Sequence, residues 1–374
     1  MKADPVLSRR QWSLTALACV ACRRRRGTGF PGYALVASAY SPSVAAVNLA
    51  TFSLAAKIEA PAPVCALQSH PGRPCGWALA SEPATVMELD TARLRVTRRL
   101  SVGRLASGMH LSAGGELLWV LCRKPPQLVG VNTRSWERAV RVSLPESPLD
   151  FDVAPDGRWA AASMSESGSL VFVELASGRA LAPLSLGRRA SLVSFRSDGR
   201  LLLAANADWP GLSIVEVPSG AVVVHLPLAL RPAHFCFKAD GGQLFITGEG
   251  ADGVAIVYPY RTEVAETILA GKSPAEMAVS TAPEYLFVAN PESGDVAVIE
   301  IETRRLIALA PVGVGVHALA VTPDSQYLLA LNESAGTMAV VRIPAITARR
   351  TRMAPLFTVV PVGPRPTALA VSRL

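Results

Sequence analysis

The 374-residue chain carries a formal net charge of +8, with 50% hydrophobic and 18% charged residues. Residues 1–26 hold seven basic side chains and one acidic one, so residues 27–374 carry only +2. A nucleic-acid-binding domain would spread its basic charge over the folded part, so we expect no nucleic-acid partner. The apolar runs after residue 26 are only strand-length, whereas a membrane span needs about 20 residues. The sequence therefore predicts no membrane span in this part of the chain.

The first 26 residues differ from the rest of the chain. Lys2, Arg9 and Arg10 precede an apolar run at 12–22, and four arginines follow it at 23–26. The Ser-Arg-Arg-Gln-Trp stretch at 8–12 resembles a twin-arginine export signal. We therefore expect residues 1–26 to be an export leader, with a disordered basic tail as the alternative. Residues 27–374 form one predicted domain, and the protein is expected to be periplasmic or extracellular.

A pattern of four short apolar runs repeats along the domain with a period of about 40 to 45 residues. The clearest copy lies at 286–327, where LFVAN, VAVIEI, LIALAPV and HALAV are separated by turn residues. Short β-branched runs bounded by Gly, Pro, Asn and Asp predict strands. Eight segments begin a LFVAN-like strand, at Tyr33, Trp77, Leu117, Trp159, Leu201, Leu244, Leu286 and Tyr327. A fixed period of this size indicates a radial or solenoid architecture.

The order of the repeats predicts a closed ring. The series begins with the second strand of a unit, at 33–38, and ends with an unpaired first strand at 366–372. Pairing these two strands would remove both exposed sheet edges. The predicted fold is thus an all-β propeller of four-stranded antiparallel blades, eight by repeat count with seven as the alternative, and a monomer.

The repeats are similar to a known family. The LFVAN strand, the V-x-V-I-E strand, the V-G-x-x-P/H element and the A-V-T-P-D turn together resemble YVTN-type β-propeller repeats. The resemblance covers Tyr33 to the C-terminus and is weakest in the first two units. Related propellers include lactone hydrolases and bacterial surface-layer repeats, and most have seven blades. The resemblance therefore implies a binding or interaction module of the bacterial cell envelope, or alternatively a lactonase-like hydrolase acting on a sugar-acid lactone.

Two cysteines of the domain are candidates for a disulfide. Cys65 and Cys75 flank a predicted hairpin symmetrically about His70, so they could bond in an oxidising compartment. The alternative is a pair of buried thiols. The cysteine spacings match no zinc pattern of the paired C-x-x-C kind.

Candidate catalytic residues lie at the start of the predicted innermost strands. Aligning the turns places Asp150, Leu192, His234, Glu276 and Ala318 at one equivalent position in five successive units. Asp150, His234 and Glu276 could converge on the central channel, where a histidine with carboxylates can bind a divalent metal or perform acid–base chemistry. The alternative is a channel filled by ordered water, and we expect neither a cofactor nor catalysis.

The connections between the second and third strands of successive units form a second candidate site. They are rich in acidic and amide side chains with one aromatic ring, at Asn206, Asp208, Trp209, Glu249, Asp252, Glu292, Asp295 and Glu333. Such an acidic arc would suit a cation, a basic peptide or a sugar stacked on Trp209. Solvated turn residues are the alternative. The sequence predicts an exported non-catalytic propeller whose partner is an unidentified protein or small molecule.

Overall fold

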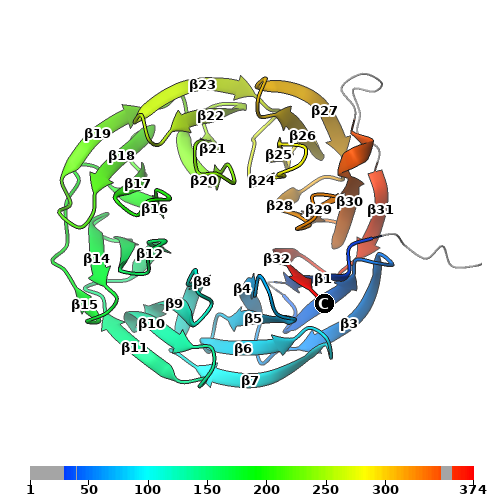
Figure 1. Ribbon diagram of the computed structural model, residues 1–374, viewed down its shortest axis with the longest axis horizontal. Helices are drawn as coiled ribbons and strands as arrows, with labels where there is room; N and C mark the ends of the chain where they lie inside the picture. The colour runs from blue at the N-terminus through cyan, green and yellow to red at the C-terminus, as the bar shows by residue number, and fades with distance from the viewer. Residues whose placement is uncertain (1–28, 39, 347–355) are drawn as a thin grey trace, which may run out of the picture.

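The computed structural model describes residues 29–38, 40–346 and 356–374, in which thirty-two strands form eight four-stranded antiparallel sheets. The sheets are arranged as blades around one axis (Figure 1). The predicted all-β propeller with eight blades is confirmed, and the seven-blade alternative is wrong. The predicted leader lies outside the described residues. In the described ranges the one helical segment is the 3-10 turn η1 (Ile343–Ala345), and no helix there could cross a membrane.

Each blade runs from an innermost strand beside the axis to an outermost strand at the circumference. Blade 1 combines both ends of the domain, as β32 (Pro366–Arg373), β1 (Gly32–Ser38), β2 (Ser43–Asn48) and β3 (Ser53–Glu59). The inner strands of blades 2 to 8 are β4 (Val64–Ser69), β8 (Leu105–Leu111), β12 (Pro148–Val153), β16 (Ala190–Phe195), β20 (Arg231–Phe237), β24 (Met277–Val279) and β28 (Val316–Val321). The second strands are β5 (Cys75–Ala80), β9 (Leu117–Lys124), β13 (Trp159–Met164), β17 (Leu201–Asn206), β21 (Leu244–Glu249), β25 (Tyr285–Asn290) and β29 (Tyr327–Asn332). The third strands are β6 (Thr85–Asp90), β10 (Pro126–Asn132), β14 (Leu170–Glu174), β18 (Gly211–Glu216), β22 (Gly253–Tyr258), β26 (Asp295–Glu300) and β30 (Thr337–Arg342). The outer strands are β7 (Arg95–Ser101), β11 (Arg138–Ser143), β15 (Arg179–Ala180), β19 (Val222–Pro227), β23 (Glu263–Leu269), β27 (Arg305–Pro311) and β31 (Leu356–Pro361).

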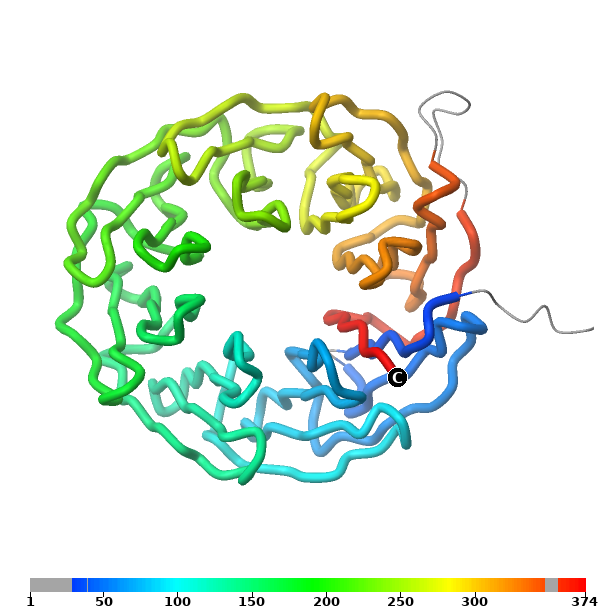
Figure 2. The backbone as a smooth tube through the Cα atoms, viewed as in Figure 1, coloured from blue at the N-terminus to red at the C-terminus, as the bar shows by residue number. Residues whose placement is uncertain are grey.

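The ring is closed by pairing of the two ends of the domain, as predicted. β32 pairs antiparallel with β1 from Gly32–Arg373 to Ser38–Pro366. Figure 2 shows the red C-terminal strand beside the blue N-terminal strand. A hydrophobic cluster joins Val36 of blade 1 to Leu329 and Met338 of blade 8, so side-chain packing crosses the same seam.

The hydrophobic core lies between neighbouring blades. The second and third strands are apolar on both faces, because each sheet is covered by the next one on either side. Trp77, Trp119, Phe172, Phe245 and Phe287 are among the largest fully buried side chains, and they occupy these middle strands. Burial of each such aromatic or branched aliphatic side chain stabilises the fold by roughly 1.5–3 kcal/mol.

The strand order brings two sets of loops to one end of the ring. In an antiparallel sheet, the connection between second and third strands lies at the same end as the connection that enters the next inner strand. We call this end the entry face. It carries all the loop residues of the predicted acidic arc and the beginning of each inner strand, so it contains the candidate functional sites.

Candidate functional site

The predicted equivalent position recurs in the inner strands. Register shifts occur just before Asp150, His234 and Ala318, where the inner strand meets the second strand of its blade. Asp150 then pairs with Ser163, and His234 pairs with Thr247. At each shift the inner strand has one extra residue, which changes the direction of the side chain that follows it. The shared register explains why residues 42 positions apart occupy matching places around the axis.

Asp150 is bound to the neighbouring blade. Its Oδ2 accepts a hydrogen bond of 2.9 Å from the backbone N–H of Val193 on β16. Burial raises the pKa of this carboxyl to about 6, the hydrogen bond opposes the rise, and nearby Asp152 adds to it. The carboxylate therefore satisfies a backbone donor at the exposed edge of an inner strand, which is a structural task.

Asp152 extends this link, and the sequence reasoning missed it. Its Oδ2 accepts hydrogen bonds from the Phe195 N–H at 2.8 Å and from the Ser194 Oγ at 3.0 Å. On the other side, His110 Nδ1 of blade 3 lies 3.5 Å from its Oδ1. Asp152 thus connects blades 3, 4 and 5 along the channel wall. Its place two residues after Asp150, on the same side of β12, was the available sequence signal.

His234 and Glu276 do not join Asp150 in one site. His234 lines a pocket on the entry face, and burial lowers the pKa of its imidazole. Glu276 lines a different cavity, and burial raises the pKa of its carboxyl to about 7. Within the described ranges, no group of three or more His, Cys, Asp or Glu side chains could hold a metal ion. The three residues therefore occupy three separate environments.

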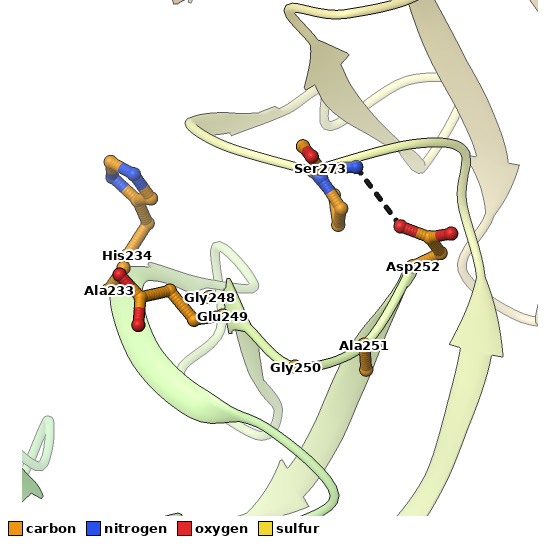
Figure 3. Close-up of a pocket in the computed structure, with 9 residues that line it drawn as sticks. Ala233, His234, Gly248, Glu249, Gly250, Ala251, Asp252 and Ser273 are labelled. Atoms are coloured by element: carbon orange, nitrogen blue, oxygen red, sulfur yellow. Dashed lines mark hydrogen bonds between the residues drawn. The ribbon is translucent and has the colours of Figure 1, made fainter.

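The entry-face pocket has a volume of about 460 Å³ and lies between the loop at residues 249–252 of blade 6 and the start of blade 7. His234 and Glu249 lie on one side, and Asp252 with Ser273 on the other (Figure 3). The Ser273 N–H donates to Asp252 Oδ1 at 3.1 Å, and its Oγ donates to Glu292 Oε1 at 2.6 Å. Ser273 therefore ties together two acidic loops of the predicted arc.

Glycine shapes one wall of this pocket. The second strands of blades 5, 7 and 8 end in Asn206, Asn290 and Asn332, whereas blade 6 has Gly248 there. A Cβ at Gly248 would lie 1.9 Å from the Arg231 carbonyl oxygen, so only glycine fits. Gly250 turns the loop with φ of +99°. The wall at both positions is bare backbone, which leaves room for a ligand.

Asn206 of the predicted arc has counterparts in Asn290 of blade 7 and Asn332 of blade 8. The side chains of Asn206, Asn290 and Asn332 are buried. Asn290 Nδ2 donates to the Ala270 carbonyl at 2.9 Å and to Asp295 Oδ1 at 2.8 Å. Asn332 likewise donates to the Val312 carbonyl at 2.7 Å. Asn290 and Asn332 thus anchor the end of an outer strand to the next blade, and Asp295 supports Asn290. Asn206 Oδ1 instead accepts a hydrogen bond of 3.0 Å from Ser213 Oγ of its own blade.

The remaining arc residues face solvent or other protein groups. Asp208 accepts a hydrogen bond of 3.1 Å from the Arg189 N–H, and Glu333 is exposed. The guanidinium of Arg188 lies 5.0 Å from the ring centre of Trp209, and His225 packs edge-on against the same ring. Arg188 thus covers the ring of Trp209, on which the sequence analysis expected a sugar to stack.

Basic residues are interleaved with the acidic ones, which the loop-by-loop reading missed. They lie at or beside the start of four inner strands, at Arg104, Arg189, Arg231 and Arg365. Arg231 Nη1 lies 3.5 Å from Glu249 Oε2, and Arg104 Nε lies 3.8 Å from Glu82 Oε1. These exposed pairs are weak, yet they make the entry face mixed in charge. The signal was visible in the 42-residue spacing of Arg189 and Arg231.

Cys65 and Cys75, the candidates for a disulfide, are both free cysteines in the structure. Cys65 lies at the register shift between Val64 and Ala66, whereas the His70 N–H donates to the Cys75 carbonyl at the other end of the hairpin. The turn at 70–74 sets this register, so symmetry about His70 in the sequence did not bring the two sulfurs together.

Comparison with known proteins supports the propeller fold but identifies no family. No family model and no curated protein matches the chain, so the YVTN-type resemblance stays a prediction. Dihydro-heme d1 dehydrogenase NirN in complex with DHE is 16% identical, with a TM-score of 0.75 over 95% of this chain and 78% of that chain. Hydrazine synthase of Kuenenia stuttgartiensis is 15% identical, with a TM-score of 0.55 over 71% of this chain and 94% of that chain. At these identities the likeness shows a shared propeller fold alone.

Proposed function

We propose that this chain is an exported β-propeller that binds a small ligand in the entry-face pocket between blades 6 and 7. The observation that carries the proposal is the pocket itself. Its volume of about 460 Å³ lies in the range of small-molecule sites, and polar groups converge on it from two blades. A rigid ring can vary such loops without disturbing its core.

The pocket chemistry favours a ligand that donates hydrogen bonds. Glu249 and Asp252 offer carboxylate oxygens, and Asp252 has one oxygen left after it accepts the Ser273 N–H. His234 is neutral near pH 7 because burial lowers its pKa, so one ring nitrogen also accepts. An ammonium group or a set of hydroxyls meets these acceptors. Amines, basic peptides and sugars are therefore the proposed ligand classes.

Binding is proposed in preference to lactone hydrolysis. A hydrolase needs an acid–base pair or a metal at one place. Asp150 holds the backbone of β16, while His234 and Glu276 line different cavities. No observation favours a shared reaction centre for these three residues.

A haem-type tetrapyrrole is the second candidate ligand. NirN, the propeller that overlays most of this chain, was solved in complex with DHE. The basic residues beside the inner strands, including Arg189 and Arg231, could pair with the carboxylates of such a ligand. His234 is a neutral imidazole of the kind that haem iron takes as a ligand.

A thermal-shift series on the full chain tests the ligand proposal. A ligand present at 100 times its Kd should stabilise the folded state by about 2.7 kcal/mol, which corresponds to about 4 °C in Tm for a domain of this size. We expect amines or oligosaccharides to lose this shift in Asp252→Asn. A haem shift should be lost in His234→Ala and retained in Asp252→Asn. Glu333→Gln, on the same face outside the pocket, is the control. A flat response to all probes, or shifts unchanged in both variants, contradicts the proposal.

Export is tested separately in cells. Replacing Arg9 and Arg10 by lysine should keep the charge but remove the guanidinium pair that a twin-arginine signal requires. We expect the native chain in the periplasmic fraction and the double variant in the cytoplasm, as measured by fractionation and immunoblotting. An unchanged distribution would mean that the basic segment is not an export signal.

A further inference from the structure

A second pocket lies in blade 2, at the end of the ring opposite the entry face. It has a volume of about 370 Å³ and lies between the turn at residues 70–74, which joins β4 to β5, and the turn at residues 91–94, which joins β6 to β7. Because the strands are antiparallel, both connections lie at the end away from the entry face. The pocket has no lining residue in common with the entry-face pocket, and its volume falls in the range of small-molecule sites.

A small side chain in this pocket occupies a position that is bulky in six other blades. The last residue of each third strand pairs with a residue of the second strand, and in blade 2 this pair is Asp90 with Cys75. The residues paired at the same point in blades 1, 3, 4, 5, 7 and 8 are Tyr33, Leu117, Trp159, Leu201, Tyr285 and Tyr327. A cysteine side chain is smaller than all six. Cys75 therefore leaves open a space that a larger side chain takes in the other blades.

The two carboxylates of the pocket are already paired within the protein. Glu88 Oε2 accepts hydrogen bonds from Arg98 Nε at 2.8 Å and from Thr97 Oγ1 at 2.7 Å. Asp90 Oδ2 accepts one from Arg93 Nη1 at 3.0 Å, and its Oδ1 accepts two backbone N–H groups of the following turn at 3.0 Å. Burial acts to raise the pKa of both carboxyls, but these hydrogen bonds bring each pKa below its usual value. Both carboxylates are thus charged and satisfied without a cationic ligand.

Arg73 is a charged group of the pocket that is left over. Its guanidinium makes no hydrogen bond or ion pair with any residue that the structure describes. Burial raises the pKa of the Cys75 thiol, and the charge of Arg73 opposes that rise, so the guanidinium lies close enough to act on the thiol. The three guanidinium groups of Arg73, Arg93 and Arg98 outnumber the two carboxylates of the pocket by one. The site therefore has a net charge of +1.

The rest of the pocket wall is mostly apolar. Pro74 and Ala92 are exposed on its two turns, and the half-buried Cys75 lies between them on β5. A pocket with an apolar wall and one free cationic group is suited to a ligand that has both an apolar part and one negative charge. A guanidinium binds a carboxylate through two parallel hydrogen bonds.

We propose that this pocket binds a small monocarboxylate with an apolar body, such as an aryl-substituted or short aliphatic acid. Its carboxylate pairs with Arg73, and its apolar part packs against Cys75 and Pro74. The site shares no residue with the entry-face pocket, so either proposal can fail without the other.

Titration of the full chain with 3-phenylpropionate at pH 7, followed by ligand-observed NMR, tests the proposal. The neutral 3-phenylpropanamide and the cationic 3-phenylpropylammonium ion have similar shapes but lack the negative charge. We expect both to bind at least about tenfold more weakly than the carboxylate, because neither forms the charged pair with Arg73.

Variants assign the binding to the pocket. Arg73→Gln should raise the Kd for 3-phenylpropionate about tenfold, because it removes a hydrogen-bonded ion pair. Cys75→Leu, which introduces the side chain that blade 3 has at this point, should abolish binding by filling the space. Cys75→Ser keeps the space and should change the Kd by less than about threefold. Arg104→Gln, which changes an exposed arginine of the entry face, is the matched control and should leave the Kd unchanged.

Alkylation of Cys75 gives a second measurement that does not depend on a variant. At ten times its Kd, 3-phenylpropionate should slow the reaction of Cys75 with N-ethylmaleimide about tenfold by mass action, as measured by peptide mass spectrometry. The rate at Cys65, outside the pocket, should not change. Circular dichroism confirms that each variant is folded. Absence of 3-phenylpropionate binding, equal binding of the amide or the ammonium ion, binding that survives in Cys75→Leu, or alkylation of Cys75 that ignores the ligand overturns the proposal.

Discussion

A chain that lacks residues 366–374 is expected to lose its cooperative unfolding transition. These residues form β32, the inner strand of blade 1, which pairs with β1 over its whole length. Without them β1 becomes an open edge with unpaired backbone groups, and the apolar seam between blades 8 and 1 loses Leu369 and Val371. The link from Ser372 Oγ to Thr91 Oγ1 of blade 2, at 3.0 Å, also disappears. The remaining blades no longer form a closed ring.

Differential scanning calorimetry and size-exclusion chromatography measure this outcome. Removal of Leu374 alone is the matched control, because that side chain is 58% exposed and lies beyond β32. A synthetic peptide of residues 364–374 added to the shortened chain should restore part of the transition by pairing with the open edge. If the shortened chain unfolds with an unchanged Tm, closure by β32 does not stabilise the ring.

Glu276→Gln is expected to stabilise the protein at pH 8 by about 3 kcal/mol. The folded-state pKa of Glu276 is raised from 4.5 to about 7 by burial, and one pKa unit corresponds to about 1.4 kcal/mol. For a raised pKa, the stabilising contribution of the protonated form is complete below pH 4.5 and is lost as the pH rises toward 7. Above pH 7 the native protein must bury a carboxylate, whereas glutamine remains neutral.

Urea unfolding at pH 5 and pH 8 measures the difference between the variant and the native chain. The gain should be small at pH 5 and approach its full size at pH 8. Glu333→Gln, which changes an exposed carboxylate, should shift stability by less than about 0.5 kcal/mol at both pH values. An equal gain at pH 5 and pH 8 would show that the titration of Glu276 is not its source.

The positions of the candidate site residues could be predicted from the sequence, but the residues that they contact could not. The 42-residue spacing placed Asp150, His234 and Glu276 at matching points, and the register shifts of the inner strands agree with that alignment. It could not show that Asp150 bonds to Val193 of the next blade, because that contact depends on how two sheets lie against each other. Local turn reasoning also gave no reason to pair Glu249 with Arg231, which lies 18 residues earlier in the chain.

The repeat pattern by itself determined the all-β architecture, the eight blades and the closure of the ring, because strand periodicity and turn residues are local properties that recur with one period. The tertiary structure alone decided which polar side chains are structural and which are free. Asn290 donates a hydrogen bond to Asp295, whereas the hydroxyl of Thr367 is buried without a partner among the described residues. Burial and hydrogen bonding between blades depend on groups far apart in the chain, so their outcome appears only when the ring is closed.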